Sequence, residues 1–475
     1  MKASPEPRPL WLARRPRTTG ALSEVRSPWA GDVVARVHLA SAAEADEAAA
    51  RASEAAPAFA RLSTDERRRL LRAVAERLST DVETFAGVIR DEAGKPVTQA
   101  RAEVRRAAEV FQLAAGEAER SGGRVVPVDF APGNESLRCL VRPFPRGPAL
   151  AIGPFNFPLN LLAHKVAPAL AAGCPIVVKP PPQAPTAGLM LGELIASLAP
   201  GSWPAGFLSV LPCDADVAAK LSADARFKVV SFTGSERVGW QVRAAASRAH
   251  TVLELGGDAA VIVCADADLE AAARRIAWGA SAHAGQVCVS VQRILVASSV
   301  RARFESLLVE AFRDIATGDP AEGAVVCGPV IDDAAADRVD GLIASAGRRL
   351  VGGERHGRLF TPALLTDVDA GSPLASDEAF GPVAGLWSFD RFEEALSMVN
   401  GSRFGLQAGL YTHDLGRVFD AHETLLVGGL VVNDVPTLRV DSYPYGGTKG
   451  SGLCREGGVE GLGEYLEPRV LLIRT

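Results

Sequence analysis

Apolar residues recur at helical spacing along residues 41–120. The clearest stripe consists of Leu70, Leu71, Val74 and Leu78. Three hydroxyl residues stand three positions before a glutamate, which is the capping-box spacing of a helix N-terminus: Ser41 with Glu44, Ser63 with Glu66, and Thr80 with Glu83. Gly94 suits a helix C-terminus, because glycine tolerates a left-handed backbone. The pattern predicts a run of helices over this stretch.

Short β-rich runs alternate with alanine-rich stretches after about residue 145. The runs with the pattern of buried strands are ALAI (149–152), PIVVK (175–179), FLSVL (207–211), KVVSF (228–232) and AVIVC (260–264). The intervening stretches 159–172, 186–198 and 214–223 have a helical pattern. A second such series runs from about 256 to 432, with clearer strands at RILVA (293–297), LVGGE (350–354) and LVVN (430–433). The alternation predicts βαβ units and parallel sheets, and hence an α/β fold.

Two further segments have a strand pattern outside these series. Residues 121–142 start with Gly-Gly and alternate in polarity, which predicts a β-hairpin that projects from the core. Residues 469–473 predict an isolated C-terminal strand. Such a strand needs a partner, and a neighbouring subunit is one candidate.

Length and charge limit the classes of protein. A chain of 475 residues is too long for one hydrophobic core, so two or three domains are expected. The net charge of −5 gives no sign of a nucleic acid or an anionic membrane as a partner. The N-terminal stretch 1–20 is rich in Arg and Pro and lacks the apolar core of a secretory signal. The apolar stretch 148–178 is interrupted by polar residues and prolines, so no membrane span is expected.

The seven cysteines are an odd number, and no CxxC pair occurs among them. Neither a disulfide framework nor a structural zinc motif is expected, no metal is predicted, and a reducing cytoplasm is the expected compartment. A free cysteine is most often a small buried apolar residue. Cys288, in GQVCVSVQR (285–293), would need a lowered pKa or a nearby base to act as a nucleophile.

Other polar residues follow predicted strands, where α/β sheets place their sites. Asn156, in GPFNFP (153–158), is either an amide donor to an oxyanion or a turn residue. Glu254, in LELGGD (253–258), is either a base or a solvated carboxylate. Lys179 ends a strand in KPPPQAP (179–185), and FTGSERVG (232–239) places Gly234 and Ser235 at a strand-to-helix turn whose amides suit a pyrophosphate. The glycine spacing is not GxGxxG.

In their order and spacing, these strings make the chain similar to the aldehyde dehydrogenase superfamily over nearly its whole length. Two further strings match, DEAFGPV (377–383) and PYGGTKGSGLCREGG (444–458). Glu254 and Cys288 stand 34 residues apart, and Asn156 and Lys179 stand 23 apart, as the family pattern requires. The resemblance implies oxidation of an aldehyde to a carboxylic acid with NAD or NADP.

The resemblance also implies a role for each matching residue. Cys288 would be the nucleophile, with Asn156 holding the oxyanion and Glu254 activating the water that hydrolyses the thioester. Lys165 and Glu456 match a pair thought to relay protons. The residues that match cofactor-binding positions are Phe155, Lys179, Pro182, Gly234, Ser235, Leu255, Glu378 and Phe380. For Phe380, ordinary core packing is the alternative.

The architecture implied by the resemblance has three parts. A Rossmann-like cofactor domain would comprise residues 1–120 and 143–255, and an α/β catalytic domain residues 256–436. Residues 121–142 and 437–475 would form a small β oligomerisation flap and bridging segments of a dimer or tetramer.

Some positions depart from the family pattern. Pro182 stands where members that prefer NAD have Glu, and losing that carboxylate removes a repulsion against the 2′-phosphate of NADP. Phe155 stands where Trp is frequent, and Asp258 follows ELGG in place of Lys or Asn.

The C-terminal stretch 433–447 is similar to lactaldehyde and phosphonoacetaldehyde dehydrogenases. Arg439 there would either hold an anionic substrate tail or lie at a surface or interface, and the same alternatives apply to Arg105 and Arg106. Two other functions are open on the same fold. A CoA-acylating enzyme is disfavoured by Glu254, and a non-catalytic structural protein by the joint presence of Cys288, Glu254 and Asn156.

Overall fold

The computed structural model describes residues 6–475, so the first five residues of the Arg- and Pro-rich N-terminus lie outside the described part. Four helices follow one another as the sequence predicts: α1 (Ala42–Phe59), α2 (Thr64–Thr80), α3 (Val82–Ala93) and α4 (Val97–Arg120). Ser41 and Ser63 form the predicted capping boxes, and Gly94 ends α3 with φ 65°. The prediction for Thr80 was wrong. Its hydroxyl donates to the carbonyl of Arg77 in the last turn of α2, and α3 starts only after Asp81.

The first large sheet has eight strands in the order β2-β1-β9-β8-β7-β10-β11-β23. Its strands are β1 (Leu10–Leu12), β2 (Arg15–Arg17), β7 (Ala149–Ile152), β8 (Ile176–Lys179), β9 (Leu208–Val210), β10 (Val229–Thr233), β11 (His250–Glu254) and β23 (Gly452–Leu453). The central strands β9, β8, β7, β10 and β11 run parallel, which confirms the predicted βαβ pattern. The connecting helices are α5 (Asn160–Ala172), α6 (Thr186–Leu198), α7 (Ala215–Ala223) and α8 (Glu236–Ala245). A separate antiparallel pair, β3 (Leu22–Arg26) and β4 (Val33–His38), lies near the N-terminus.

The second large sheet has seven strands in the order β14-β17-β18-β13-β12-β20-β21. Its strands are β12 (Ala260–Val263), β13 (Arg293–Ala297), β14 (Arg348–Val351), β17 (Ala363–Thr366), β18 (Val383–Phe389), β20 (Gln407–Tyr411) and β21 (Gly429–Val432). Its helices are α9 (Leu269–Ser281), α10 (Arg301–Arg313), α11 (Asp333–Ser345), α12 (Pro373–Ser376), α13 (Phe392–Asn400) and α14 (Leu415–Thr424). The predicted strand LVGGE stops at Val351, because Gly352 and Gly353 take left-handed φ values of 68° and 86° and turn the chain.

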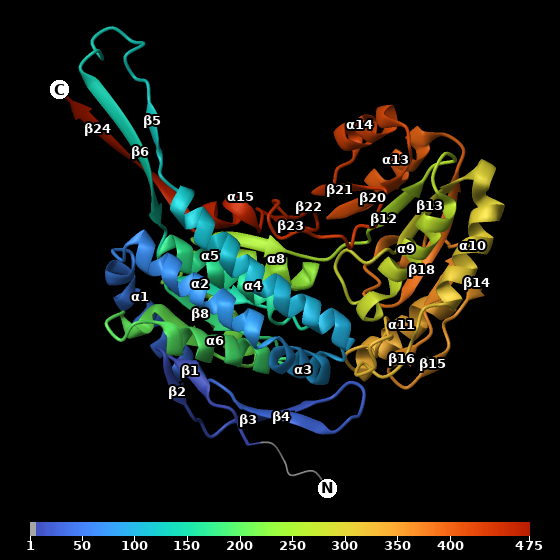
Figure 1. Cartoon of the computed structure of the whole chain (residues 1–475), viewed down its shortest axis with the longest axis horizontal. Coiled ribbons are helices and arrows are strands. Elements are labelled where there is room, and N and C mark those ends of the chain that lie inside the picture. The colour runs from blue at the N-terminus through green and yellow to red at the C-terminus, as the bar shows by residue number, and fades with distance from the viewer. Residues whose placement is uncertain (1–5) are drawn as a thin grey trace.

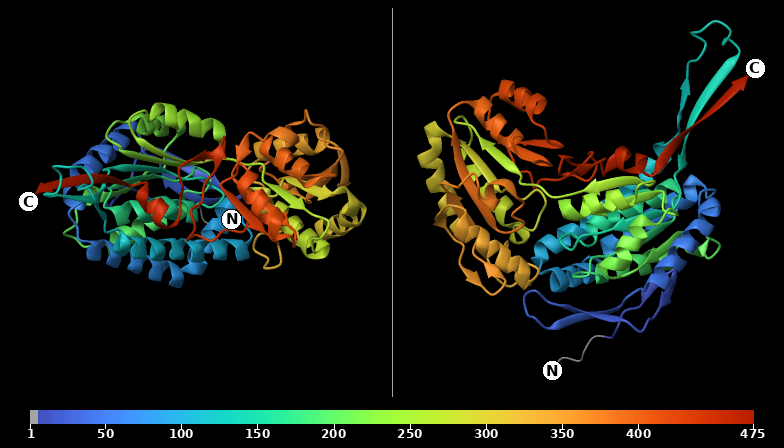
Figure 2. Two further views of the ribbon diagram at one scale, coloured as in Figure 1. Left: turned by 90° about the horizontal axis from the view of Figure 1, so that it is seen from above. Right: turned by 180° about the vertical axis from the view of Figure 1, so that it is seen from behind.

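A long β arm projects from the first sheet (Figures 1 and 2). It consists of β5 (Arg124–Val126), β6 (Leu137–Pro145) and the C-terminal strand β24 (Leu466–Arg474), in the order β24-β6-β5. The predicted hairpin is therefore present. The C-terminal strand pairs with β6 of its own chain along its whole length, from Leu466 opposite Pro145 to Arg474 opposite Leu137.

The remaining strands are short: β15 (Arg355–His356), β16 (Leu359–Phe360), β19 (Phe404–Gly405) and β22 (Thr448–Lys449). The short helix α15 (Gly458–Gly463) precedes β24. Within residues 6–475, no helix is both long and apolar enough to span a membrane.

The segment between β11 and β12 passes from one large sheet to the other (Figure 1). The parallel strands of the first sheet end toward it, and those of the second sheet, which run parallel to β12, begin there. The predicted catalytic and cofactor residues lie around this crossing. The two sheets keep separate apolar clusters, so the polar groups between them are held by two independently packed cores.

Candidate active site

Cys288 lies in a loop whose backbone is tightly folded. His283, Ala284 and Gly285 take successive left-handed φ values of 51°, 55° and 64°. A Cβ at Gly285 would lie 2.1 Å from the carbonyl oxygen of Gly381, so only glycine fits there. The Cys288 thiol is half-buried, and its sulfur lies 3.3 Å from the hydroxyl of Tyr445. Burial raises the pKa of this thiol to about 11, so it is protonated near neutrality and needs a base or a bound ligand to ionise.

Asn156 is fixed against the Cys288 loop. It follows β7, is 3% exposed, and its amide donates a hydrogen bond of 2.8 Å to the carbonyl of Gln286. Its side-chain oxygen accepts from the backbone N–H of Phe157. One amide hydrogen is therefore used to orient the group, and the second is available as a donor.

Glu254 ends β11 and is 3% exposed. Among the described residues, neither of its carboxylate oxygens has a hydrogen-bond partner. Burial, together with the nearby charge of Glu456, raises the pKa of Glu254 well above its ordinary value. A Cβ at Gly446 would approach the Glu254 carboxylate to 2.7 Å, so glycine there leaves room for this side chain. An unpartnered carboxylate with a raised pKa is suited to take up a proton near neutral pH.

Lys165 and Glu456 form a buried ion pair, as the resemblance implies. Lys165 Nζ lies 2.7 Å from Glu456 Oε1 and donates 3.0 Å to the hydroxyl of Ser231. Burial alone would raise the pKa of Glu456, but Lys165 and other nearby cations outweigh burial and lower it. The pKa values of these two neighbouring carboxyl groups therefore move in opposite directions, downward for Glu456 and upward for Glu254.

Arg439 is inside the molecule, so the alternative of a surface or interface position was wrong. Its side chain is 8% exposed, and its guanidinium carbon lies 3.8 Å from the centre of the Tyr445 ring. Its Nη2 lies 3.1 Å from His164 Nε2 and 3.9 Å from Glu456. The guanidinium is therefore separated from the Cys288 sulfur by a single tyrosine.

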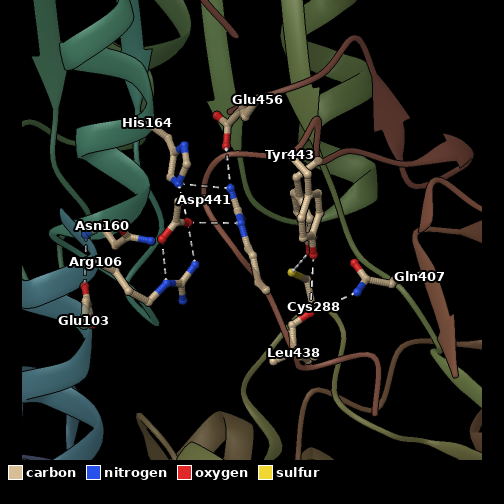
Figure 3. A network of polar contacts seen from close by, with 12 residues as sticks. Glu103, Arg106, Asn160, His164, Cys288, Gln407, Leu438, Asp441, Tyr443 and Glu456 are labelled. Atoms are coloured by element: carbon tan, nitrogen blue, oxygen red, sulfur yellow. Dashed lines mark hydrogen bonds and ion pairs between the residues drawn. The ribbon is translucent and has the colours of Figure 1, made fainter. Parts of the chain in front are cut away.

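Asp441 joins the polar network shown in Figure 3. One of its oxygens, Oδ1, lies 2.8 Å from His164 Nε2 and 3.4 Å from Arg439 Nε. Arg106 on α4 donates two hydrogen bonds of 2.7 and 2.8 Å to the same carboxylate. The His164 contact and the Arg106 pair hold the pKa of Asp441 well below its usual range, although burial opposes this. Arg105 does not take part, since it is exposed on the other side of α4.

The predicted cofactor residues line a separate side of the crossing. Glu378 accepts a 3.2 Å hydrogen bond from the Gly257 N–H, and burial raises its pKa to about 7. The rings of Phe155 and Phe380 meet edge to face, with centroids 5.9 Å apart. Phe380 has φ 40°, which is unusual for an ordinary core residue.

The remaining cofactor positions lie at the ends of β8 and β10. Lys179 ends β8 and is largely buried, which lowers its pKa, and Pro182 is exposed in the following loop. Gly234 follows β10, and its N–H donates to the carbonyl of Glu254. Ser235 begins α8 but makes no side-chain capping bond within the described chain, so its hydroxyl and the first N–H groups of α8 can accommodate a pyrophosphate. Leu255 packs directly against Gly239 of α8, where a Cβ would lie 2.2 Å away. These groups fit a dinucleotide.

Some contributors were missed from the sequence. His164, Asp441 and Tyr445 were not singled out, although Tyr445 belongs to the matching string PYGG. Asp258 also gains an explanation, because its carboxylate lies 3.2 Å from Arg293 of β13 and the pair is buried. The residue that replaces the usual Lys or Asn therefore ties the crossing segment to the second sheet.

Comparison with known proteins gives concordant results. The model of the aldehyde dehydrogenase family matches residues 15–471. The chain is 38% identical over 461 residues to 3-sulfolactaldehyde dehydrogenase of Priestia aryabhattai, covering 96% of each chain. It superposes with a TM-score of 0.97 and 37% identity on aldehyde dehydrogenase 21 from Physcomitrella patens in complex with the reaction product succinate, over 99% of each chain. NADP-dependent glyceraldehyde-3-phosphate dehydrogenase from Bacillus halodurans, complexed with NADP, gives a TM-score of 0.95 and 31% identity over 99% of each chain.

Proposed function

Because the chain belongs to the aldehyde dehydrogenase family and oxidises an aldehyde to a carboxylic acid with NAD or NADP, we propose that Cys288 is its nucleophile and that its substrate carries an anionic group. The proposal of an anionic substrate is carried by Arg439, a buried cation whose guanidinium is separated from the Cys288 thiol only by the ring of Tyr445. Retention of Glu254 supports hydrolysis of the acyl intermediate rather than transfer to CoA.

In the proposed first step, the ionised form of Glu254 takes the proton of the Cys288 thiol. The sulfur forms a bond to the aldehyde carbon, and the carbonyl oxygen becomes an oxyanion. The free amide hydrogen of Asn156 and the backbone N–H of Cys288 donate to that oxygen. Fixed donors of this kind contribute about 10²–10³-fold each to the rate. Glu378, Phe155 and Phe380 would hold the nicotinamide, which would supply the hydride acceptor that converts the adduct on Cys288 to a thioester.

In the proposed second step, Glu254 takes a proton from water, and the water oxygen attacks the thioester carbon. The C–S bond then breaks, the carboxylic acid leaves, and the Cys288 sulfur takes back the proton from Glu254, which restores the thiol. Glu254 lies in the same buried charge cluster as Glu456 and Lys165, which supports the outward passage, through that pair, of the proton taken from the thiol in the first step. Burial of all three side chains excludes bulk water from competing with this route.

The charges around the thiol favour a negatively charged substrate. The cationic groups of the cluster are Arg106, Lys165 and Arg439, and the carboxylates paired with them are Asp441 and Glu456. Burial lowers the pKa of His164 and raises that of Glu254, so each shift favours the neutral form of its group. The three cations are paired with two carboxylates, and an anionic substrate tail would offset the remaining positive charge.

The relatives support the same substrate class. 3-Sulfolactaldehyde, glyceraldehyde 3-phosphate and succinate, which occur in the names of three similar proteins, all carry a charged group a few bonds from the reacting carbon. They differ in whether this group is a sulfonate, a phosphate or a carboxylate. A short-chain aldehyde with such a group is the substrate class that we propose for this chain.

Replacing the nucleophile tests the first part of the proposal. Cys288→Ala removes the sulfur that forms the thioester in this proposal, so we expect steady-state aldehyde oxidation to fall to background. Dinucleotide binding, measured by quenching of protein fluorescence, should remain close to wild type. Substantial turnover in Cys288→Ala, with the cofactor still bound, would show that another residue attacks the aldehyde.

Replacing Arg439 tests the substrate class. Sulfonated, phosphorylated and carboxylated short aldehydes, each with a neutral analogue of the same length, are assayed with both cofactors. We expect the wild type to prefer the anionic aldehydes, and Arg439→Gln to lower kcat/KM for them by roughly 10–1000-fold, since losing one charged hydrogen bond costs about 1.5–3 kcal/mol and an unpaired charge costs more. Neutral analogues should change little. An equal loss for both classes would mean that Arg439 only maintains the structure of the site.

The proposal also includes a domain organisation. Cofactor binding is assigned to residues 1–120 and 143–255, and assembly of the subunits to the β arm. The two separate sheets and the projecting arm support it.

A further inference from the structure

We propose that His250, Cys454 and Glu464 form a binding site for Zn²⁺, distinct from the Cys288 site. His250 begins β11, Cys454 follows β23, and Glu464 follows α15. Within residues 6–475, this is the one group of three His, Cys, Asp or Glu side chains whose ligand atoms lie within 4.8 Å of one another. Imidazole, thiolate and carboxylate are all ligands that Zn²⁺ accepts.

The separations are close to those of a tetrahedral zinc site. The Cys454 sulfur lies 3.8 Å from His250 Nε2, and Glu464 Oε2 lies 2.5 Å from the same nitrogen. Zinc–ligand bonds of about 2.0–2.3 Å require ligand atoms roughly 3.3–3.6 Å apart in a tetrahedron. The sulfur and nitrogen are thus nearly in position. The carboxylate needs to withdraw by less than about 1 Å, which a side-chain rotation provides because Glu464 is partly exposed.

The chemistry of the three groups also suits a divalent ion. The Cys454 thiol donates a hydrogen bond of 3.4 Å to the carbonyl of Thr251, so it carries a proton in the structure described. Zinc binding would replace that proton, which passes to the buffer, and form a Zn–S bond to the thiolate. The thiolate and the Glu464 carboxylate together offset the two charges of the ion and screen it from the nearby Arg243 and Arg455. A water molecule would complete the coordination on the exposed side.

The backbone at Cys454 is a second unusual feature of this place. Its φ is 68°, in the left-handed region that favours glycine, and holding cysteine there costs on the order of 1 kcal/mol. Glycine would occupy this position without strain. The presence of cysteine is explained if its sulfur binds a ligand. The strained turn aims that sulfur at the imidazole of His250 across the β11–β23 pair.

No sequence pattern indicated this site. Cys454 and His250 are 204 residues apart, and neither belongs to a CxxC or a His-rich string. The absence of a zinc spacing motif therefore says nothing about ligands that only folding brings together.

Zinc binding is tested in the Cys288→Ala chain, so that neither the nucleophile nor turnover enters the result. Co²⁺ is the spectroscopic probe, because a thiolate–cobalt bond gives a near-ultraviolet charge-transfer band and tetrahedral cobalt gives visible absorption. Stoichiometry is measured by titrating Zn²⁺ in competition with a chromogenic chelator. We expect one equivalent of each metal, a thiolate band with cobalt, and a higher Tm in the presence of zinc.

The matched variants are Cys454→Gly, His250→Gln and Glu464→Gln, each in the Cys288→Ala chain. Cys454→Gly removes the thiol and relieves the left-handed strain, so it should fold at least as well as its parent. We expect it to lose the cobalt charge-transfer band, and all three variants to bind zinc at least tenfold more weakly. Cys264→Ser, a buried thiol on the second sheet, is the control and should bind as the parent does.

The proposal is overturned if Cys288→Ala binds no stoichiometric zinc, or if Cys454→Gly keeps the thiolate–cobalt band. Equal loss of zinc in Cys264→Ser would also overturn it, because binding would then reflect general unfolding. None of these results depends on whether Cys288 is the nucleophile or on which aldehyde is oxidised.

Discussion

Glu254 and Glu456 are two buried carboxyl groups in one cluster whose pKa values move in opposite directions. Glu456 lies 2.7 Å from Lys165, whereas no described residue donates a hydrogen bond to Glu254. Burial and the charge of Glu456 raise the pKa of Glu254, and the cations lower that of Glu456. Two glutamates of the same exposure are thus separated into an ionised partner and a neutral group ready to exchange a proton.

Glu254 should set the acidic limb of the pH–rate profile. Only its ionised form can take a proton from water, and its pKa is raised, so thioester hydrolysis should increase with pH through a pKa well above 4.5 and level off beyond it. Glu254→Gln should remove that limb and slow hydrolysis by about 10²–10⁴-fold, leaving a burst of reduced cofactor in stopped-flow traces. The exposed Glu460→Gln is the control. An unaltered profile in Glu254→Gln would assign the base elsewhere.

At the scale of elements, the parallel strands place the binding groups at their ends. β8 ends in Lys179, β10 leads to Gly234 and Ser235, and β11 ends in Glu254. These strands are adjacent or nearly adjacent in the eight-stranded sheet. Residues that are up to 75 positions apart in sequence therefore meet along one edge, as the carboxyl ends of parallel strands do.

The loop between β8 and α6 should control the choice of cofactor. Pro182 lies there, exposed, three residues after Lys179. Without a carboxylate at this position, we expect kcat/KM values with NAD and NADP that agree within about tenfold, a difference of 1.4 kcal/mol. Pro182→Glu should shift the preference toward NAD by roughly tenfold or more, because the new charge repels the 2′-phosphate. Pro182→Gln is the control. Its side chain is similar in size to glutamate but uncharged, so it shows the effect of losing the proline without the effect of charge repulsion. A strong NAD preference in the wild type would contradict this account.

At the scale of the whole molecule, the β arm extends beyond both sheets (Figure 2). Its outer strand β24 lies at the edge of the arm and exposes Val470, Leu471, Leu472 and Ile473 by 41–68%. An exposed apolar edge strand is an unusual surface for a monomer. We propose that a second copy of the chain packs against this exposed strand.

Sedimentation analysis should find at least two chains per particle. Replacing both Val470 and Leu472 by Lys places two like charges on one face of β24, so we expect dissociation to monomers at micromolar concentration. Leu22→Lys, an exposed apolar residue on β3 away from the arm, should leave the assembly intact. A wild-type monomer, or an intact assembly in the double variant, would remove the arm from the interface.

Features that depend on neighbouring residues and on ordered strings were predictable from the amino-acid sequence. Helical spacing and two capping boxes predicted α1 to α4, and apolar runs predicted the central strands, because these signals are local. The prediction of a third capping box was wrong, because the Thr80 hydroxyl donates a hydrogen bond to a carbonyl in the last turn of α2. The matching strings indicated the family and its reaction, which the family model confirms, and they predict Cys288, Glu254 and Asn156 as the catalytic residues.

The way in which distant charges combine depends on the folded structure and was not predictable from the chain. It buried Arg439 beside Tyr445, joined Arg106 to Asp441 across 335 residues, and paired Asp258 with Arg293. The direction of each pKa shift depends on burial and on neighbours that folding alone supplies. The cluster of His250, Cys454 and Glu464 also depends on folding. Its three side chains come from separate elements, and their spacing in the sequence matches no metal-binding motif.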